Sequence, residues 1–405
     1  MRVVLVIPFF SPIGHSCLDA VAGLEGVTQL GLVTHASADQ IPPRLRARVQ
    51  HYQIRDCLQP AQLLAGVASL AAGWGGVDRL VGYLEQLQGP LAAVRARLGI
   101  PGVTEEVALN FREKNRMKEV LRRAGVPVAR QALLTGREDA ARFVRQVGYP
   151  IVVKPPAGAG SVATMRVSSD AELVGALEKL FVSPSNPAQA EEFVQGEEHT
   201  FETVVIDGKP VWRSSSYYLP GPLTVIENPW MQYCVLLPRQ MPEAAKQFRP
   251  TNDAALRALG LGTGLTHMEW FRRSDGSTVV SEVAARPPGV QLMPLMSHAH
   301  EVDMWAKWAE LMVHNRWSVP ERRWATGVAF FRGQGRGNTV REVHGLDAAQ
   351  AAAGNCVVDR RLPVVGQSRA SSYEGEGWAI VRAETTGRAV EALRALVSNV
   401  RVVLG

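Results

Sequence analysis

The segment GYPIVVKPPAGAGSVATMRVS, residues 148–168, constrains the fold more than any other part of the chain. Its apolar start predicts a strand that ends at Lys154. Its Gly- and Pro-rich middle predicts a loop with Gly158, Gly160 and Ser161, after which the chain turns back into a strand. A cation at a strand end, beside backbone amides that a ligand can approach closely, is suited to holding phosphate. The segment therefore predicts a phosphate-binding loop between two strands.

Two other nucleotide sites are excluded at this point. The loop fits the pattern GxGxxA, but a dinucleotide-binding site requires a helix after the glycines, and here TMRV predicts a strand. No stretch of the chain carries a complete Walker A motif, so a P-loop is also excluded.

The first hundred residues alternate strand-like and helix-like segments, which is typical of an open α/β domain. Residues 3–10 and 27–36 predict buried parallel strands, and Ser16 is expected to cap a short helix between them. Further along, alternating apolar residues predict two hairpins, which turn at Asp207-Gly208 and at residues 274–276. The tail mixes strands with a final helix, so α/β and α+β regions follow one another.

The second hairpin carries two carboxylates, Glu269 and Glu282. A turn centred on residues 274–276 places both carboxylates near the same level of the ladder. Arg286 lies four residues after Glu282. Mg²⁺ prefers one or two carboxylates together with substrate phosphates, and an arginine presents a fork to a carboxylate or phosphoryl group. Taken singly, each glutamate is more often a surface group.

Composition restricts the partners and the compartment. The chain has 405 residues, 46% of them hydrophobic, which is enough for a sizeable core divided among several domains. No apolar run reaches the length of a membrane-spanning helix, so no membrane partner is expected and a cytoplasmic protein is predicted. The four cysteines form no CxxC pair. The net charge of +6 suits an anionic ligand, but the basic residues form no stripe for nucleic acid.

The order of these motifs resembles the ATP-grasp superfamily over roughly residues 104–315. The matching pieces are the lysine of FREKNRMK before AGVPV, the lysine of VVKP before the glycine loop, the EEFVQGEEH strand and the E…ExxxRPPG hairpin. The resemblance implies ATP held between two lobes, with Mg²⁺ as the metal. It divides the chain into a pre-ATP-grasp α/β domain (1–103), a small lobe (104–188), a large lobe (189–318) and a β-rich C-terminal subdomain (319–405).

The resemblance also assigns roles to individual residues. It implies that Lys114 and Lys154 contact the ATP phosphates. The backbone of the hinge strand residues Glu192, Phe193 and Val194, with Glu191 beside them, would hold adenine. Glu198 would accept a hydrogen bond from the ribose hydroxyl, Glu269 and Glu282 would bind Mg²⁺, and Arg286 would steady the acyl phosphate. The loop residues Gly158, Gly160 and Ser161 belong to the same nucleotide site.

One departure and one variant form refine the resemblance. Ala284 stands where many members carry an asparagine metal ligand, which leaves the number of Mg²⁺ ions open. The ExAARxPG form and the THxE around His267 are similar to the L-amino-acid ligase branch, which makes dipeptides and related amides. His267 is therefore a candidate for substrate binding or proton handling, or else a satisfied strand histidine.

Four further predictions concern other aromatic, histidine and loop residues. The HAHE cluster of His298, His300 and Glu301 is expected at the exposed start of a helix. Trp305 and Trp308 are expected in the core. Trp230, and the pair Val290 and Gln291, are candidates to line the substrate pocket.

The predicted function is an ATP-dependent carboxylate–amine ligase that uses small-molecule acids and amines through an acyl phosphate. Two alternatives stay open: an ATP-grasp carboxylase or nucleotide-biosynthesis ligase, and a degenerate nucleotide-binding module with a regulatory role. A homodimer is the default oligomer. The identities of the acid and the amine are not encoded in any local rule.

Overall fold

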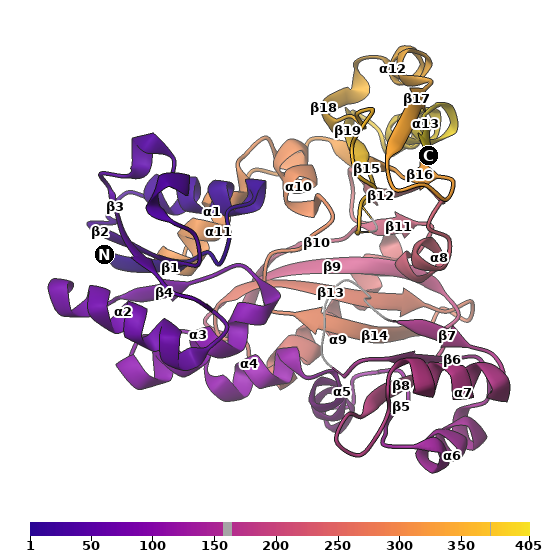
Figure 1. The fold of residues 1–405 in the computed structure, drawn as a ribbon, viewed down its shortest axis with the longest axis horizontal. Coiled ribbons are helices and arrows are strands. Elements are labelled where there is room, and N and C mark those ends of the chain that lie inside the picture. The colour runs from indigo at the N-terminus through magenta and orange to yellow at the C-terminus, as the bar shows by residue number, and fades with distance from the viewer. Residues whose placement is uncertain (157–163, 373) are drawn as a thin grey trace.

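The computed structural model describes residues 1–156, 164–372 and 374–405 (Figure 1). Its N-terminal part is a four-stranded parallel sheet in the order β3-β2-β1-β4, which confirms the predicted open α/β pattern. Three helices accompany it. The elements are β1 (Arg2–Val6), α1 (Pro12–Ala22), β2 (Gln29–Thr34), β3 (Val49–Gln53), α2 (Pro60–Trp74), β4 (Arg79–Val81), the 3₁₀ helix η3 (Glu85–Leu87) and α3 (Gln88–Leu98).

The predicted cap of α1 is wrong. The helix begins at Pro12, and the Ser11 hydroxyl accepts a hydrogen bond from the Gly14 amide at 3.1 Å. Proline is preorganised for the first helical position, so the helix starts one turn earlier than the serine at position 16 suggested. Ser16 lies inside the helix, where its hydroxyl donates to the carbonyl of Pro12.

A small antiparallel sheet in the order β5-β8-β6-β7, called the small lobe here, carries the lysine strand. Strands β6 and β7 pair antiparallel, with Ile151 opposite Val167, so the predicted return of the chain into a strand is confirmed. The glycine loop between them falls largely outside the described residues. The elements are β5 (Gln131–Leu134), α6 (Arg137–Val147), β6 (Ile151–Lys154), β7 (Met165–Val167), α7 (Asp170–Lys179) and β8 (Ala188–Glu192).

A nine-stranded sheet forms the centre of the molecule, in the order β14-β13-β9-β11-β12-β15-β19-β18 with β10 also paired to β9 (Figure 1). The first predicted hairpin is confirmed: Asp207 and Gly208 join β9 to β10 with φ of 48° and 75°, as a tight two-residue turn requires. The strands are β9 (Glu197–Ile206), β10 (Lys209–Ser214), β11 (Tyr217–Leu219), β12 (Tyr233–Leu237), β13 (Gly264–Arg272), β14 (Thr278–Ala284), β15 (Ala325–Phe331), β18 (Val357–Arg361) and β19 (Gly377–Ala383).

Helices pack on this sheet and connect it to the other parts. Helix α11 packs on α1, so residues far apart in sequence share one core with the N-terminal sheet. Trp305 and Trp308 of α11 belong to that core, as predicted. The helices are α4 (Glu105–Arg112), α5 (Lys114–Arg123), α8 (Pro222–Glu227), α9 (Glu243–Leu259), α10 (Leu292–His300) and α11 (Met304–His314).

The C-terminal region adds a three-stranded sheet, β16-β20-β17, and two helices. Its elements are β16 (Gly333–Gln334), β17 (Val340–His344), α12 (Leu346–Ala353), α13 (Thr386–Asn399) and β20 (Arg401–Leu404). The division into four domains stays a prediction. No helix among the described residues is long and apolar enough to span a membrane.

The prediction for the HAHE cluster is wrong. His298 and His300 end α10 instead of starting it, and Glu301 is its left-handed C-cap with φ of 56°. His300 is buried and its Nδ1 lies 2.7 Å from the carbonyl of Pro320. The apolar LMPLM run before the cluster forms the first turns of the helix. The spacing of residues within HAHE did not indicate that the cluster lies at the end of a helix.

Candidate active site

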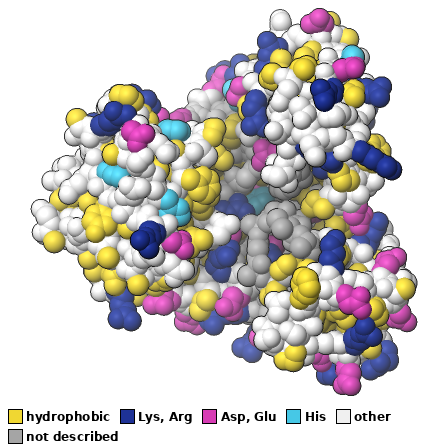
Figure 2. Space-filling model, in the orientation of Figure 1, with side chains coloured by type: hydrophobic (Ala, Val, Ile, Leu, Met, Phe, Trp, Pro, Cys, Tyr) yellow, Lys and Arg dark blue, Asp and Glu magenta, His cyan; other side chains and the backbone are white. Residues whose placement is uncertain are grey.

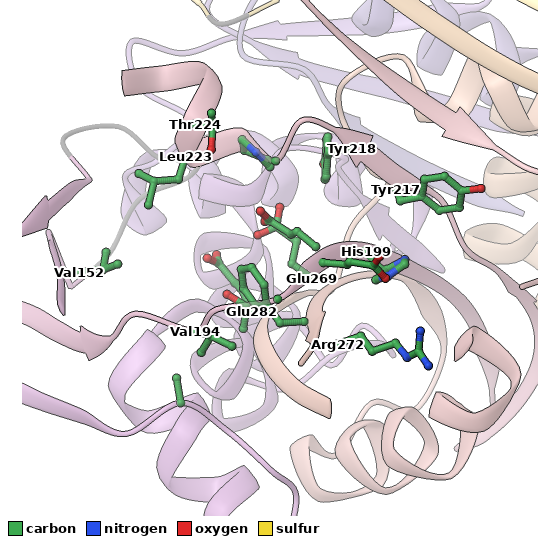
Figure 3. Close-up of a pocket in the computed structure, with 18 of the residues that line it drawn as sticks. Val152, Val194, His199, Tyr217, Tyr218, Leu223, Thr224, Glu269, Arg272 and Glu282 are labelled. Atoms are coloured by element: carbon green, nitrogen blue, oxygen red, sulfur yellow. The ribbon is translucent and has the colours of Figure 1, made fainter. Parts of the chain in front are cut away.

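A cavity of about 1040 Å³ lies between the small lobe and the central sheet. Figure 2 shows the surface hollowed near the middle of this face, where the parts of the molecule meet. Lys154 of β6 lines the cavity on the side of the small lobe. Val152 of the same strand, Glu269 of β13 and Glu282 of β14 also line it (Figure 3).

The two predicted carboxylates are direct partners across the β13–β14 ladder, as expected from the turn. Both reach into the cavity in Figure 3. Glu282 Oε2 contacts the ammonium of Lys114, the first residue of α5. Over residues 1–156, 164–372 and 374–405, no three His, Cys, Asp or Glu side chains form a group that could hold a metal.

Lys154 takes part in a buried charge network that the sequence did not predict. Its Nζ lies 3.0 Å from Glu191 Oε2, and Glu191 Oε1 lies 2.6 Å from the Nζ of Lys118 on α5. Burial would raise the pKa of Glu191, but the two lysines lower it to about 2. Burial, together with the nearby charge of Lys154, lowers the pKa of Lys118 to about 8 against the attraction of Glu191.

His267 forms a second network on the floor of the cavity. Its Nδ1 lies 2.9 Å from Glu202 Oε1, and its Nε2 lies 3.7 Å from Glu269 Oε1. Burial alone would lower the pKa of His267, but these carboxylates raise it to about 9. The ring is therefore an imidazolium at neutral pH, which donates hydrogen bonds and contributes positive charge. His267 is not a base in this state.

The predicted hinge follows β8. The amides of Glu192 and Phe193 donate to the carbonyls of Arg130 and Pro150, so among the described residues the amide of Val194 is the hinge donor without a partner. Glu192 also lines the cavity, and its carboxylate is paired with Arg130 at 2.6 Å and with Arg273 at 3.1 Å. Val194 lines the cavity (Figure 3).

Glu198 also lines the cavity, near the start of α8. Burial and the charge of Glu269 raise its pKa well above the usual range. A Cβ on Gly221, the residue that precedes α8, would lie 2.9 Å from Glu198 Oε2, so the carboxylate occupies space that only glycine leaves open. The position is compatible with the predicted acceptor of a hydroxyl group.

Arg286 follows β14 and lines the cavity. Its Nε donates to Glu85 Oε2 at 2.9 Å, and its Nη1 donates to the carbonyl of Pro287 at 2.8 Å. Val290 also lines the cavity, with φ of 46°, which strains a β-branched residue. Gln291 instead caps α10 and donates to Glu374 at 3.4 Å.

Other predicted residues do not join the cavity or fall outside the described chain. Trp230 is 56% exposed and lies outside the cavity lining, so the prediction that it lines the pocket is wrong. Gly158, Gly160 and Ser161 lie outside the described residues. Ala284 pairs with His267 across the ladder and lines the cavity.

Comparisons with known proteins agree with this geometry. Residues 113–208 match the family of the carbamoyl-phosphate synthase L chain, ATP-binding domain. The L-arginine-specific L-amino acid ligase of Bacillus subtilis is 24% identical over 312 residues, which cover 74% of each chain. The alanine–anticapsin ligase of Bacillus subtilis is 28% identical over 258 residues, and the match spans 53% of that enzyme.

The fold is also that of solved enzymes. The L-amino acid ligase from Bacillus licheniformis superposes with a TM-score of 0.77 over 100% of this chain and 99% of the other, at 17% identity. The N5-carboxyaminoimidazole ribonucleotide synthetase from Thermotoga maritima gives 0.70, also at 17% identity. These comparisons bear out the predicted resemblance to the ATP-grasp carboxylate–amine ligases. The predicted fold class is confirmed as well.

Sequence reasoning missed three charged residues of this ATP-grasp site. Lys118 lies one helical turn after Lys114, and Glu202 lies four residues after Glu198 on one strand face, so both spacings carried a usable signal. Glu85 reaches Arg286 across 201 positions of sequence, and no local pattern could have linked them.

Proposed function

We propose that this chain is a Mg²⁺-dependent ligase that uses ATP to activate a carboxylic acid as an acyl phosphate and then transfers the acyl group to an amine. The observation that carries the proposal is the meeting of Lys114, Lys154, Glu269 and Glu282 in one cavity between two lobes. Cations for phosphate and carboxylates for a metal are the parts that this chemistry needs.

ATP would bind with its adenine beside the hinge and its phosphates toward the paired carboxylates. Val152 and Val194 would supply apolar contacts, and the amide of Val194, which has no partner within the described part of the chain, would donate to the adenine edge. The ammonium groups of Lys114 and Lys154 would bind phosphate oxygens. Both are paired with glutamates before the nucleotide arrives, so each lysine is already positioned at the wall of the cavity.

The two carboxylates fit Mg²⁺ when phosphate oxygens complete its shell. Glu269 and Glu282 stand opposite one another in the ladder, and the cation prefers one or two protein carboxylates with substrate oxygens. Burial would raise the pKa of Glu269, but His267 and other cations lower it, so the carboxylate is ionised and ready to ligate. When bound, Mg²⁺ supplies charge neutralisation for the transferring phosphoryl group.

Two cations are placed to stabilise the acyl phosphate and the tetrahedral intermediate that forms when the amine attacks. Arg286 presents its remaining guanidinium donors to the cavity, and the imidazolium of His267 lies beside the metal carboxylates. A carboxylate is a poor acyl donor because it must expel an oxide. Phosphorylation replaces that oxide with phosphate, whose developing charge these cations stabilise.

Amino acids or related metabolites are the proposed substrates. The support comes from relatives described as an L-arginine-specific L-amino acid ligase and an alanine–anticapsin ligase. The proposal is tested by following ADP release by the purified protein with a panel of amino acids, singly and in pairs, with products identified by mass. ADP release with formation of an amide is the expected result. Turnover with bicarbonate would instead identify a carboxylase, and ATP binding without turnover would identify a binding module.

A further inference from the structure

Glu85 links three distant segments behind the cavity. It is 7% exposed and lies on η3, in the N-terminal part of the chain. Its Oε2 accepts from Arg286 Nε at 2.9 Å, and its Oε1 accepts from Arg112 Nη1 at 2.8 Å. Arg112 ends α4, two residues before Lys114. One buried carboxylate therefore joins the N-terminal α/β part to two cationic segments of the site.

The backbone that carries Glu85 is held firmly. Leu87, two residues after Glu85, is fully buried in the core of the N-terminal sheet. Gln88 donates to the carbonyls of Gly82 at 3.3 Å and Leu84 at 3.0 Å, which fixes the turn on both sides. A side chain on such a support holds its partner within a narrow range of positions.

Glu85 contacts Arg286 from outside the cavity lining. Arg286 lines the cavity, whereas Glu85 lies outside its lining. An arginine has five N–H donors in a fixed plane, so the bonds to Glu85 and Pro287 fix that plane and leave the remaining donors for a ligand. The geometry fits a residue that orients Arg286, and it does not fit one that binds substrate.

We propose that Glu85 is a positioning residue of the ligase: it orients the guanidinium of Arg286 for the acyl phosphate, so the N-terminal part of the chain completes the active site. This inference rests on the proposed function for its kinetic consequence. The orientation itself is a property of the protein alone, and it is measured separately.

The kinetic test is a double-mutant cycle with Glu85→Gln, Arg286→Ala and the double variant. Glu85→Gln keeps the shape but removes the charge, so we expect kcat to fall by about 10- to 100-fold through misplacement of Arg286, with the KM for ATP nearly unchanged. In the Arg286→Ala background the same change should cost less than about 2-fold, because the group through which Glu85 acts is gone. Equal losses in both backgrounds would overturn the proposal.

The matched control is Asp253→Asn. Asp253 pairs with Arg213 at 2.6 Å, is partly buried, and lies with Arg213 outside the cavity lining. The Asp253→Asn variant loses the same kind of arginine–carboxylate pair, so it should have a lower melting temperature and an unchanged kcat. A kcat loss like that of Glu85→Gln would assign the effect to stability alone. Should Glu85→Gln fail to fold, Glu85→Asp retains the charge but shortens the reach, and the same comparison applies.

An activity-independent measurement separates failure of this inference from failure of the proposed function. In protein labelled with ¹⁵N at arginine Nε, the signal missing from Arg286→Lys identifies Arg286. We expect this signal to be distinct and slow to exchange in the wild type and in Asp253→Asn, and to move to the position of free arginine in Glu85→Gln. A signal that does not change in Glu85→Gln would refute the orienting role, whether or not the enzyme turns over.

Discussion

Replacing Lys118 with methionine should stabilise the protein, although it removes a buried ion pair. Lys118 is 1% exposed, and burial lowers its pKa from 10.5 to about 8 despite the attraction of Glu191. At 1.36 kcal/mol per pKa unit, the ammonium costs about 3 kcal/mol at neutral pH even after its pairing is included. Methionine has similar length and no charge, so Lys118→Met should recover up to about 3 kcal/mol.

Removing the charge of Glu191 should instead lower the free energy of unfolding. Glu191 keeps Lys154 at 3.0 Å when Lys118 is replaced, so no carboxylate is left unpaired. In Glu191→Gln, two buried lysines instead lose the one carboxylate that both of them contact, which should destabilise the protein by about 3 to 5 kcal/mol. The exposed pair of Lys246 and Glu243 gives the control, since Lys246→Met should change stability by less than about 0.5 kcal/mol.

The assay is urea unfolding followed by circular dichroism at pH 7 and pH 10. Between pH 8 and 10.5 the unfolded chain retains a proton on Lys118 that the folded chain has released, so wild-type stability rises with pH in that range. The advantage of Lys118→Met should therefore be largest at pH 7 and smaller at pH 10. A variant less stable than wild type at pH 7 by more than about 2 kcal/mol would refute the reasoning, because the ion pair would then outweigh the burial of its charge.

Two further predictions concern the proposed chemistry. Lys154→Ala and Glu282→Ala should each lose at least about 100-fold in ADP release while remaining folded by circular dichroism, and near-normal turnover in both would contradict their roles. Gly221→Ala should raise the KM for ATP, because the added Cβ meets Glu198 Oε2 at 2.9 Å and displaces the proposed ribose acceptor. Gly262→Ala, whose Cβ meets nothing within 4 Å, is the control and should leave KM unchanged.

The sequence predicted those parts of the site that depend on local rules. The register of Glu269 with Glu282 followed from the length of a hairpin turn, and the structure has them as direct partners. Strand β6, ending at Lys154, followed from an apolar run bounded by a Gly- and Pro-rich loop. Strands β1 and β2 of the N-terminal sheet followed from the apolar runs at residues 3–10 and 27–36, whereas β3 was not predicted.

Side-chain direction and long-range pairing could not be predicted in this way. Glu191 and Glu192 are neighbours on one strand, and successive strand side chains point to opposite faces. Glu191 therefore enters the lysine network, while Glu192 pairs with surface arginines. Only the register of the sheet determines which of the two glutamates faces the lysines. The link from Glu85 to Arg286 depends on how the N-terminal part docks, which no window of sequence contains.

Both lysines of the cavity are already paired with carboxylates in the protein alone, and this has a consequence for how a nucleotide would enter. Lys114 is paired with Glu282, and Lys154 with Glu191. A triphosphate arriving alone would draw Lys114 away and leave Glu282 without a counter-charge in a low-dielectric site. Mg²⁺ arriving with the triphosphate would supply that counter-charge as the lysine moves to phosphate. If ATP and Mg²⁺ bind as proposed, the pairing would favour the metal–nucleotide complex over either component, because only the complex exchanges both partners at once.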